Sequence, residues 1–159
     1  MNDITLNRLK LERSEWRKDH PYGFVARPLK NLDGSWNYKV WACRIPGSFN
    51  TLWGSRLYYL FMIFSDDYPF RPPIVRFFPN IFHPNVCKNC GTVRTPLLNV
   101  NWNPSHRIRE ILLVIRSLLI VPDTSNISNE LAYSLYCVRD QNDYQRLVQW
   151  QCMRMSSQV

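Results

Sequence analysis

The sequence predicts an α+β domain with an N-terminal helix, one antiparallel sheet and then a helical second half. Two observations predict this order. Short apolar and aromatic runs separated by turn signals fill much of the first half, which is typical of strands. Apolar residues at helical spacing lie before and after these runs. With 159 residues and 45% hydrophobic content, the chain is expected to form a single domain over residues 1–159.

The first predicted helix covers residues 4–18. Leu6, Leu9 and Trp16 fall on one stripe of this helix, and that stripe is expected to face the core. The helix is expected to end before Pro21, because proline biases the residue before it away from helical backbone angles.

The strands are predicted from apolar runs and one clear turn signal. Asp33-Gly34 predicts a turn between the first two strands. Apolar and polar side chains alternate over residues 36–40, which predicts a half-buried strand there. Residues 57–64 form a continuous apolar run that predicts a central strand. Residues 74–78 predict a shorter one.

Three helices are predicted in the second half. The first has apolar residues at i, i+3, i+4 and i+7 from Ile108 to Leu119. A short helix is expected to follow, with Ser128 as its cap and Leu131 and Leu135 facing inward. A last helix, capped by Asp140, is expected to bury four side chains: Tyr144, Leu147, Val148 and Cys152.

The cysteine count favours reduced thiols. The chain has five cysteines, an odd number, and it begins without a signal-peptide pattern. No apolar run approaches the roughly 18 residues that cross a membrane. We therefore expect a soluble protein of the nucleus and/or cytoplasm, without disulfides. Cys137 and Cys152 are expected to pack within helices as small apolar side chains.

Positive charge is concentrated in the middle of the chain. The net charge is +8, and residues 71–120 hold seven basic side chains against one acidic side chain. This distribution favours acidic surfaces or an anionic tail as partners. Nucleic acid is the generic partner of a basic protein, but no basic run, RNA-binding motif or zinc finger accompanies the charge. Nucleic-acid binding therefore ranks last among the function classes.

Residues 83–96 carry the most functional information. They read His-Pro-Asn-Val-Cys-Lys-Asn-Cys-Gly-Thr-Val-Arg-Thr-Pro. This segment resembles the active-site segment of ubiquitin-like conjugating enzymes, in which His-Pro-Asn leads to Gly-Thr-Val-Cys and the cysteine carries the modifier as a thioester. Here Arg94 follows Gly-Thr-Val. Counting the family's spacing from Asn85 leads to Val93 instead, so neither alignment places a thiol there.

The resemblance extends over nearly the whole chain. Further segments, at residues 16–25, 41–47, 66–73 and 132–137, are similar to the SUMO-conjugating branch of the ubiquitin-conjugating (UBC) enzyme family. The resemblance implies a UBC-like fold, with an N-terminal helix, a four-stranded antiparallel meander and then helices. The short loop at residues 97–102 departs from the SUMO branch, whose loop is longer and acidic.

The residues at the matched active-site positions predict lost catalysis. A thioester needs a thiolate, whereas the Arg94 guanidinium is a permanent cation without a nucleophilic lone pair. Asn126 replaces an aspartate that helps to deprotonate the acceptor lysine, and Cys87 replaces a tyrosine of the acceptor groove. By the same resemblance, Asn85 would stabilise the oxyanion. For His83 we favour a structural ring bonded to local backbone.

The N-terminal helix retains a second functional surface. Arg13, Arg17 and His20 match the positions that bind a SUMO molecule non-covalently in the SUMO branch, where the overlapping helix also docks the activating enzyme. The alternative is a solvated basic helix face. The resemblance therefore implies SUMO, the activating enzyme and ligases as partners, with the chain acting as a catalytically inactive scaffold or competitor.

A rival hypothesis is an active conjugating enzyme that uses Cys90. This residue lies four positions before Arg94, so an extended chain could displace the thiol by up to roughly 13 Å. Cys87 and Cys90 also form a Cys-x-x-Cys pair, but a redox motif needs a strand-to-helix context that is missing here. A zinc site needs four ligands, and only His83 is nearby as a third. No metal or cofactor is predicted.

Overall fold

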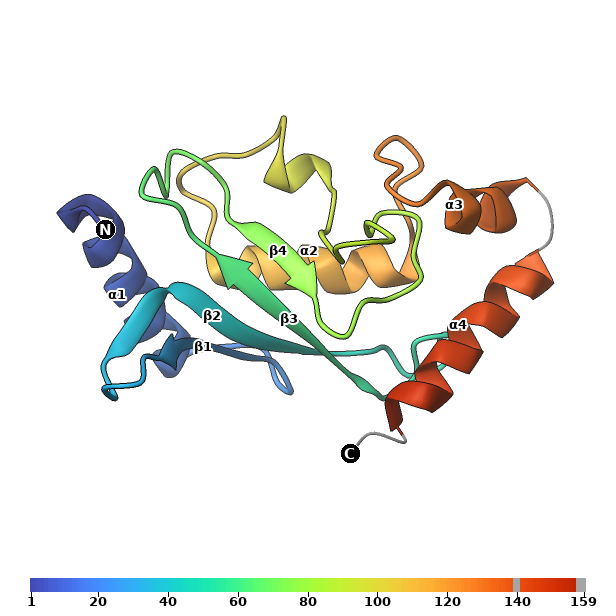
Figure 1. Ribbon diagram of the computed structural model, residues 1–159, viewed down its shortest axis with the longest axis horizontal. Coiled ribbons are helices and arrows are strands. Elements are labelled where there is room, and N and C mark those ends of the chain that lie inside the picture. Colours follow the sequence, from blue (N-terminus) through green and yellow to red (C-terminus); the bar gives the residue numbers. More distant parts are fainter. Residues whose placement is uncertain (139–140, 157–159) are drawn as a thin grey trace.

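The computed structural model describes residues 1–138 and 141–156. Its elements follow the predicted order: α1 (Asp3–Lys18), β1 (Val25–Lys30), β2 (Trp36–Pro46), β3 (Leu57–Ile63), β4 (Ile74–Phe77), the short 3-10 helix η1 (Pro96–Leu98), α2 (Ile108–Ile120), α3 (Glu130–Cys137) and α4 (Gln141–Ser156). The strands form one antiparallel sheet in the order β1-β2-β3-β4 (Figure 1). The α+β class and the meander are therefore confirmed. Within the described ranges, no helix is long and apolar enough to cross a membrane.

Helix α1 packs its predicted stripe against the rest of the domain. Leu9 and Trp16 are buried, as expected, and Leu6 is half-buried. The Asn2 side chain caps the helix by accepting a hydrogen bond from the Thr5 amide at 2.8 Å. The helix ends at Lys18, before the proline that was expected to stop it.

A buried carboxylate that the sequence did not predict joins α1 to α2. Glu12 is buried on the inner stripe of α1 and pairs with Arg8 at 2.8 Å. Its other oxygen accepts a hydrogen bond from the Ile108 amide, at 3.3 Å, where α2 begins. The first amides of a helix have no partner within the helix, so Glu12 satisfies one of them from a neighbouring element.

Strand β2 begins at Trp36, as predicted, but it extends to Pro46, beyond the expected residues 36–40, and its buried side also differs from the expectation. The alternation expected over residues 36–40 is absent, because residues 37–40 are all half-buried. Regular alternation starts later, with Trp41, Cys43 and Ile45 inside. The physical reason is a register shift between Pro28 and Leu29 in the partner strand, which interrupts the ladder at this point.

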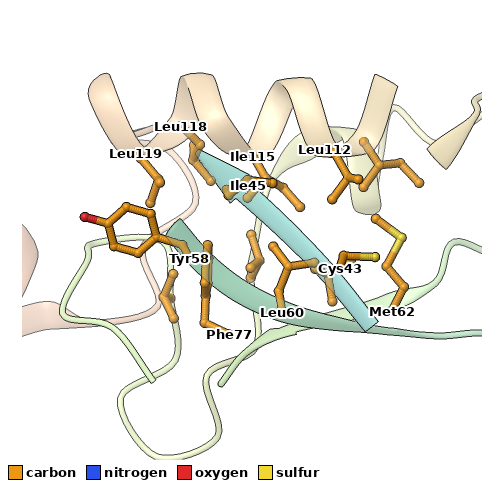
Figure 2. Packing of buried hydrophobic residues seen from close by; sticks show 14 of the residues in the cluster. Cys43, Ile45, Tyr58, Leu60, Met62, Phe77, Leu112, Ile115, Leu118 and Leu119 are labelled. Carbon is orange, nitrogen blue, oxygen red and sulfur yellow. The ribbon is translucent and has the colours of Figure 1, made fainter. Parts of the chain in front are cut away.

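The core lies between the sheet and α2. In β3, Tyr58, Leu60 and Met62 are buried, while the alternate side chains Leu57 and Tyr59 are exposed on the other face. Figure 2 shows these inward side chains and those of β2 beneath α2. The inner side chains of α2 follow the predicted helical spacing: Ile108, Ile111, Leu112, Ile115, Leu118 and Leu119.

The short helix α3 starts one residue later than its predicted cap implied. Asn129, and not Ser128, accepts the capping hydrogen bond from the Ala132 amide, at 3.2 Å. Ala132 is therefore the buried residue of α3, whereas Leu131 is 48% exposed and was wrongly expected to face inward. Leu135 packs partly against the core, as predicted.

Helix α4 buries most of the expected side chains. Tyr144, Val148 and Cys152 are buried, but Leu147 is 38% exposed, which corrects the prediction for that residue. The predicted cap, Asp140, lies outside the described residues. Cys137 is also exposed rather than packed inside, because it occupies the last position of α3.

Candidate functional site

The segment singled out by the sequence forms a small hairpin beside β4. Val86 and Val93 form an antiparallel bridge between its two limbs. Its second limb pairs with β4, because the Phe77 amide donates to the Gly91 carbonyl at 2.9 Å and the Val93 amide donates to the Val75 carbonyl at 2.8 Å. The hairpin thus extends the sheet at its β4 edge, and residue 94 follows directly after this pairing.

Gly91 makes the close approach of the hairpin to β4 possible. Its φ is +70°, a left-handed conformation that favours glycine. A Cβ atom at this position would lie 2.5 Å from the Phe77 carbonyl oxygen. The turn before Arg94 therefore requires glycine for two separate reasons.

His83 is a structural ring. It is fully buried, and its Nδ1 accepts a hydrogen bond from the Asn85 amide at 3.0 Å. Nε2 lies 2.9 Å from the Leu118 carbonyl oxygen, to which it can donate only if it carries the proton. Burial lowers the pKa of His83 from 6.5 to about 4, so the ring is neutral at physiological pH. The expected contact with local backbone is present at Nδ1, but the partner of Nε2 is Leu118, 35 residues away, and not local backbone.

Acid is expected to destabilise the fold through His83. Its folded pKa, about 4, lies below the ordinary value of 6.5, so the unfolded chain binds a proton first as pH falls. The contribution is constant above pH 6.5, decreases below it and levels off near pH 4, where the loss is on the order of 3 kcal/mol. NMR titration of the ring protons should give a midpoint near 4. A midpoint near 6.5 would contradict this assignment.

Asn85 holds the loop that follows α2. Its Nδ2 donates to the carbonyl oxygens of Asp123 and Asn126, at 2.6 and 2.8 Å. Its Oδ1 accepts from the Asp123 amide at 2.9 Å. Both amide hydrogens are thus already bonded to backbone. The oxyanion role stays a prediction, and it would require one of these bonds to break.

Arg94 lines an open groove at the β4 edge. The groove has a volume of about 330 Å³, and its walls include Pro72, Pro73, Thr92, Arg94, Asn99 and Asn126. The Arg94 amide donates to the Asn85 carbonyl at 2.8 Å, while its side chain is exposed. No cysteine is among the residues that line this groove.

Asn126 belongs to the same groove, on the loop that Asn85 holds. Its amide nitrogen donates to the Asp123 carboxylate at 2.7 Å and lies 3.0 Å from the Ser125 hydroxyl. An amide at this position offers no charge to an approaching lysine. The structure therefore brings Arg94 and Asn126 together in one groove. The expectation that Cys87 belongs to this groove was wrong, because Cys87 lies on the first limb of the hairpin, opposite Thr92, and the groove is lined by the second limb.

Arg13 and Arg17 lie together on α1. The Arg13 guanidinium carbon is 3.9 Å from the centre of the Trp36 ring, and Nη1 donates to the Tyr38 hydroxyl at 3.2 Å. Both arginines line a shallow depression of about 460 Å³ with Lys10, Ser14 and Lys18. The basic patch, as we call Arg13 and Arg17, is thus shaped by two aromatic residues of β2 that sequence reasoning missed.

His20 lies beyond the end of α1. Its ring stacks on Trp16 with centroids 5.2 Å apart, and Nδ1 is 2.8 Å from the Trp16 carbonyl oxygen. It is not among the residues that line the depression at the basic patch. The structure therefore groups Arg13 with Arg17 and leaves His20 as a neighbour held by its own contacts.

Comparison with known proteins places the chain in a family. A family model described as "Ubiquitin-conjugating enzyme" matches residues 8–152. The chain belongs to the ubiquitin-conjugating enzyme family. It is 40% identical to the SUMO-conjugating enzyme UBC9 of Caenorhabditis elegans, covering 100% of this chain and 96% of that protein. It is 43% identical to the Sumo-conjugating enzyme ubc9 of Dictyostelium discoideum, with 95% of each covered. It is 41% identical to the SUMO-conjugating enzyme SCE1 of Arabidopsis thaliana, with 93% and 92% covered.

For a member of the ubiquitin-conjugating enzyme family, an exposed thiol in the segment of residues 83–96 is of particular interest. Cys90 is exposed at the hairpin tip and donates to the Thr92 hydroxyl at 3.2 Å. A hydrogen bond from the Cys87 thiol, followed by those from Thr92, lowers the pKa of Cys90 to about 7. Much of it is therefore thiolate at neutral pH. It does not line the groove that contains Arg94.

Among the described residues, the Cys87–Cys90 pair lacks the further ligands of a metal site. Over residues 1–138 and 141–156, no group of three or more His, Cys, Asp or Glu side chains is arranged to hold a metal ion. His83, the only third ligand near the pair in sequence, is buried with its ring nitrogens at backbone groups.

Proposed function

We propose that this protein is a catalytically inactive member of the ubiquitin-conjugating enzyme family that binds SUMO and acts as a scaffold or competitor in the conjugation pathway. One observation carries the proposal. In the groove beside His-Pro-Asn, the side chain at the position after Gly-Thr-Val is an arginine, and no thiol lines the groove. The relatives named as SUMO-conjugating enzymes, similar over nearly their full length, support SUMO as the modifier.

The basic patch is the proposed binding surface. Arg13 and Arg17 are four residues apart, so they lie side by side on α1. Arg13 is held in place by Trp36 and Tyr38, which reduces the entropy lost when a partner binds. The patch contacts β2 through Arg13, and β2 is separated by β3 from the groove edge of the sheet at β4 (Figure 1). Binding of SUMO, the activating enzyme or a ligase at this surface would not require a working groove.

Reversing both charges of the basic patch is expected to abolish SUMO binding. The variant Arg13→Glu/Arg17→Glu places two anions where an acidic partner would bind, so affinity should fall by on the order of 100-fold or more. Titration of labelled SUMO by NMR or calorimetry measures this. The matched control, Arg71→Glu/Arg76→Glu, changes the net charge equally at the β4 end and should bind like wild type.

Two results would reject this assignment. The wild-type protein could show no SUMO binding, or the basic-patch variant could bind as tightly as wild type. Because Arg13 stacks on Trp36, the unfolding midpoint of the variant is measured in parallel, so that a loss of binding is not confused with a loss of fold.

A second candidate function is conjugation through Cys90. The observation that favours it is the lowered pKa of this thiol, about 7. Its position at the hairpin tip argues against it, because misplacement of a nucleophile by even about 1 Å can cost on the order of 100-fold in rate.

A further inference from the structure

Arg94 is a cation without a carboxylate partner. Several described arginines form ion pairs with a carboxylate, among them Arg8, Arg71, Arg107, Arg109 and Arg146. In the part of the chain that the structure describes, no carboxylate lies within ion-pair distance of Arg94, and its side chain makes no hydrogen bond. This guanidinium nevertheless lines a groove of about 330 Å³.

The carboxylate of Asp123, in the neighbouring loop, already accepts hydrogen bonds from its own loop. One oxygen of Asp123 accepts from the Ser125 hydroxyl and amide at 2.6 and 2.9 Å, and the other accepts from Asn126 at 2.7 Å. The Ser125 hydrogen bonds also hold the pKa of Asp123 below its usual range, so this carboxylate stays charged and bonded within its own loop. The Arg94 guanidinium is therefore available to form an ion pair with an anionic ligand.

We propose that the groove binds a carboxylate carried by an extended peptide segment, with Arg94 as the anchor. The planar guanidinium donates two parallel hydrogen bonds to a carboxylate. Pro72, Pro73 and Ile74 supply apolar wall beside it for the rest of the peptide. A phosphate dianion fits this site less well, because phosphate sites gather several cations or free backbone amides. Among the described residues that line the groove, Arg94 is the only basic one.

This inference rests on the proposed function in one respect. Where a catalytic cysteine would form a thioester, Arg94 would hold the carboxylate by an ion pair, so a partner's chain could occupy the groove without a covalent bond. The carboxylate can be the C-terminus of a chain or the side chain of an internal Glu or Asp. Both sources share the same chemistry at Arg94.

Short peptides test the site independently of the basic patch. Three probes are titrated into the ¹⁵N-labelled full chain: an acetylated Thr/Gly pentapeptide with a free C-terminus, the same peptide with a C-terminal amide, and an amidated peptide with a central Glu. In every variant, binding is read from the backbone amide signals of the groove residues Thr92, Asn99 and Asn126. In the wild type it is also read from the Nε–Hε signal of Arg94, which is assigned by its absence in Arg94→Gln. We expect at least one carboxylate probe to shift this signal and to bind about tenfold more tightly than the amide.

Two substitutions of Arg94 distinguish the effect of its charge from that of its two-pronged hydrogen-bond geometry. Arg94→Gln should lose the preference for carboxylate, and Arg94→Lys should retain part of it, since lysine keeps the charge without the two-pronged geometry. Arg27→Gln, an exposed arginine on β1 at the other edge of the sheet, should behave like wild type. Whichever carboxylate probe responds identifies the source. The proposal would be overturned if the amide bound as tightly as the carboxylate probes, or if Arg94→Gln bound them as tightly as wild type. It would also be overturned if inorganic phosphate bound more tightly than the peptides, or if 10 mM peptide, roughly the weakest affinity of interest, gave no response. None of these outcomes depends on whether SUMO binds at α1.

Discussion

Incubation with SUMO, the activating enzyme and ATP is expected to leave this protein unmodified. Arg94 offers no thiolate at the groove, and Asn126 offers no carboxylate to an acceptor lysine. A non-reducing gel measures the result, with a SUMO-conjugating enzyme of the same family as the positive control. The expected difference is all or none, because thioester formation requires a sulfur atom at the point of attack.

A band one modifier heavier that disappears on reduction would contradict this expectation. Cys90 would then be the expected site of the thioester, because with a pKa of about 7 a large fraction of this thiol is thiolate at neutral pH. Cys90→Ser would remove such a band, and Cys87→Ser would leave it in place. That pattern would establish the rival function, with the hairpin tip delivering the nucleophile.

Gly91→Ala is expected to cause a large loss of stability. Alanine at φ +70° costs roughly 1–2 kcal/mol on conformational grounds. Its Cβ would also lie 2.5 Å from the Phe77 carbonyl oxygen, which is backbone and cannot rotate away. Overpacking of this kind costs a further 1–3 kcal/mol or so. The free energy of unfolding, measured in urea, should therefore fall by roughly 2–5 kcal/mol.

Gly34 provides the matched control for this substitution. Its φ is +83°, but a Cβ atom there would have no neighbour within 4 Å. Gly34→Ala should therefore show the conformational cost alone, and the difference between the two variants measures the contact with Phe77. Equal losses in both variants would show that the hairpin can move away from β4, and Gly91 would then not fix the position of Arg94.

Most of the fold was predictable because its signals are local. The apolar spacing of α2 and the run of β3 each determine an element without reference to distant residues. The errors in the predicted caps and buried side chains arose where the choice between two neighbouring residues decides the result. In α3 the cap is Asn129 instead of Ser128, and Ala132 is buried while Leu131, rotated by about 100° from it around the helix, is exposed.

The candidate site was predictable in its residues but only partly in their roles. Arg94, Asn126 and Asn85 could be identified from the sequence, because each matches a position in the family's motifs. The partners of Asn85 could not, since they lie 38 and 41 residues away in the chain. The support of Arg13 by Trp36 depends in the same way on a tertiary contact that no local pattern reports.

The three hydrogen bonds of Asn85 change what the His-Pro-Asn motif signifies. Its asparagine joins two segments that are distant in the sequence, and its histidine is buried with Nε2 close to the Leu118 carbonyl of α2. Mutating either residue would weaken the domain whether or not the domain performs chemistry. Selection for folding alone can therefore preserve the motif in a lineage that has abandoned the reaction. Finding His-Pro-Asn in a genome identifies an architecture, and the residue after Gly-Thr-Val must be read before an activity is assigned.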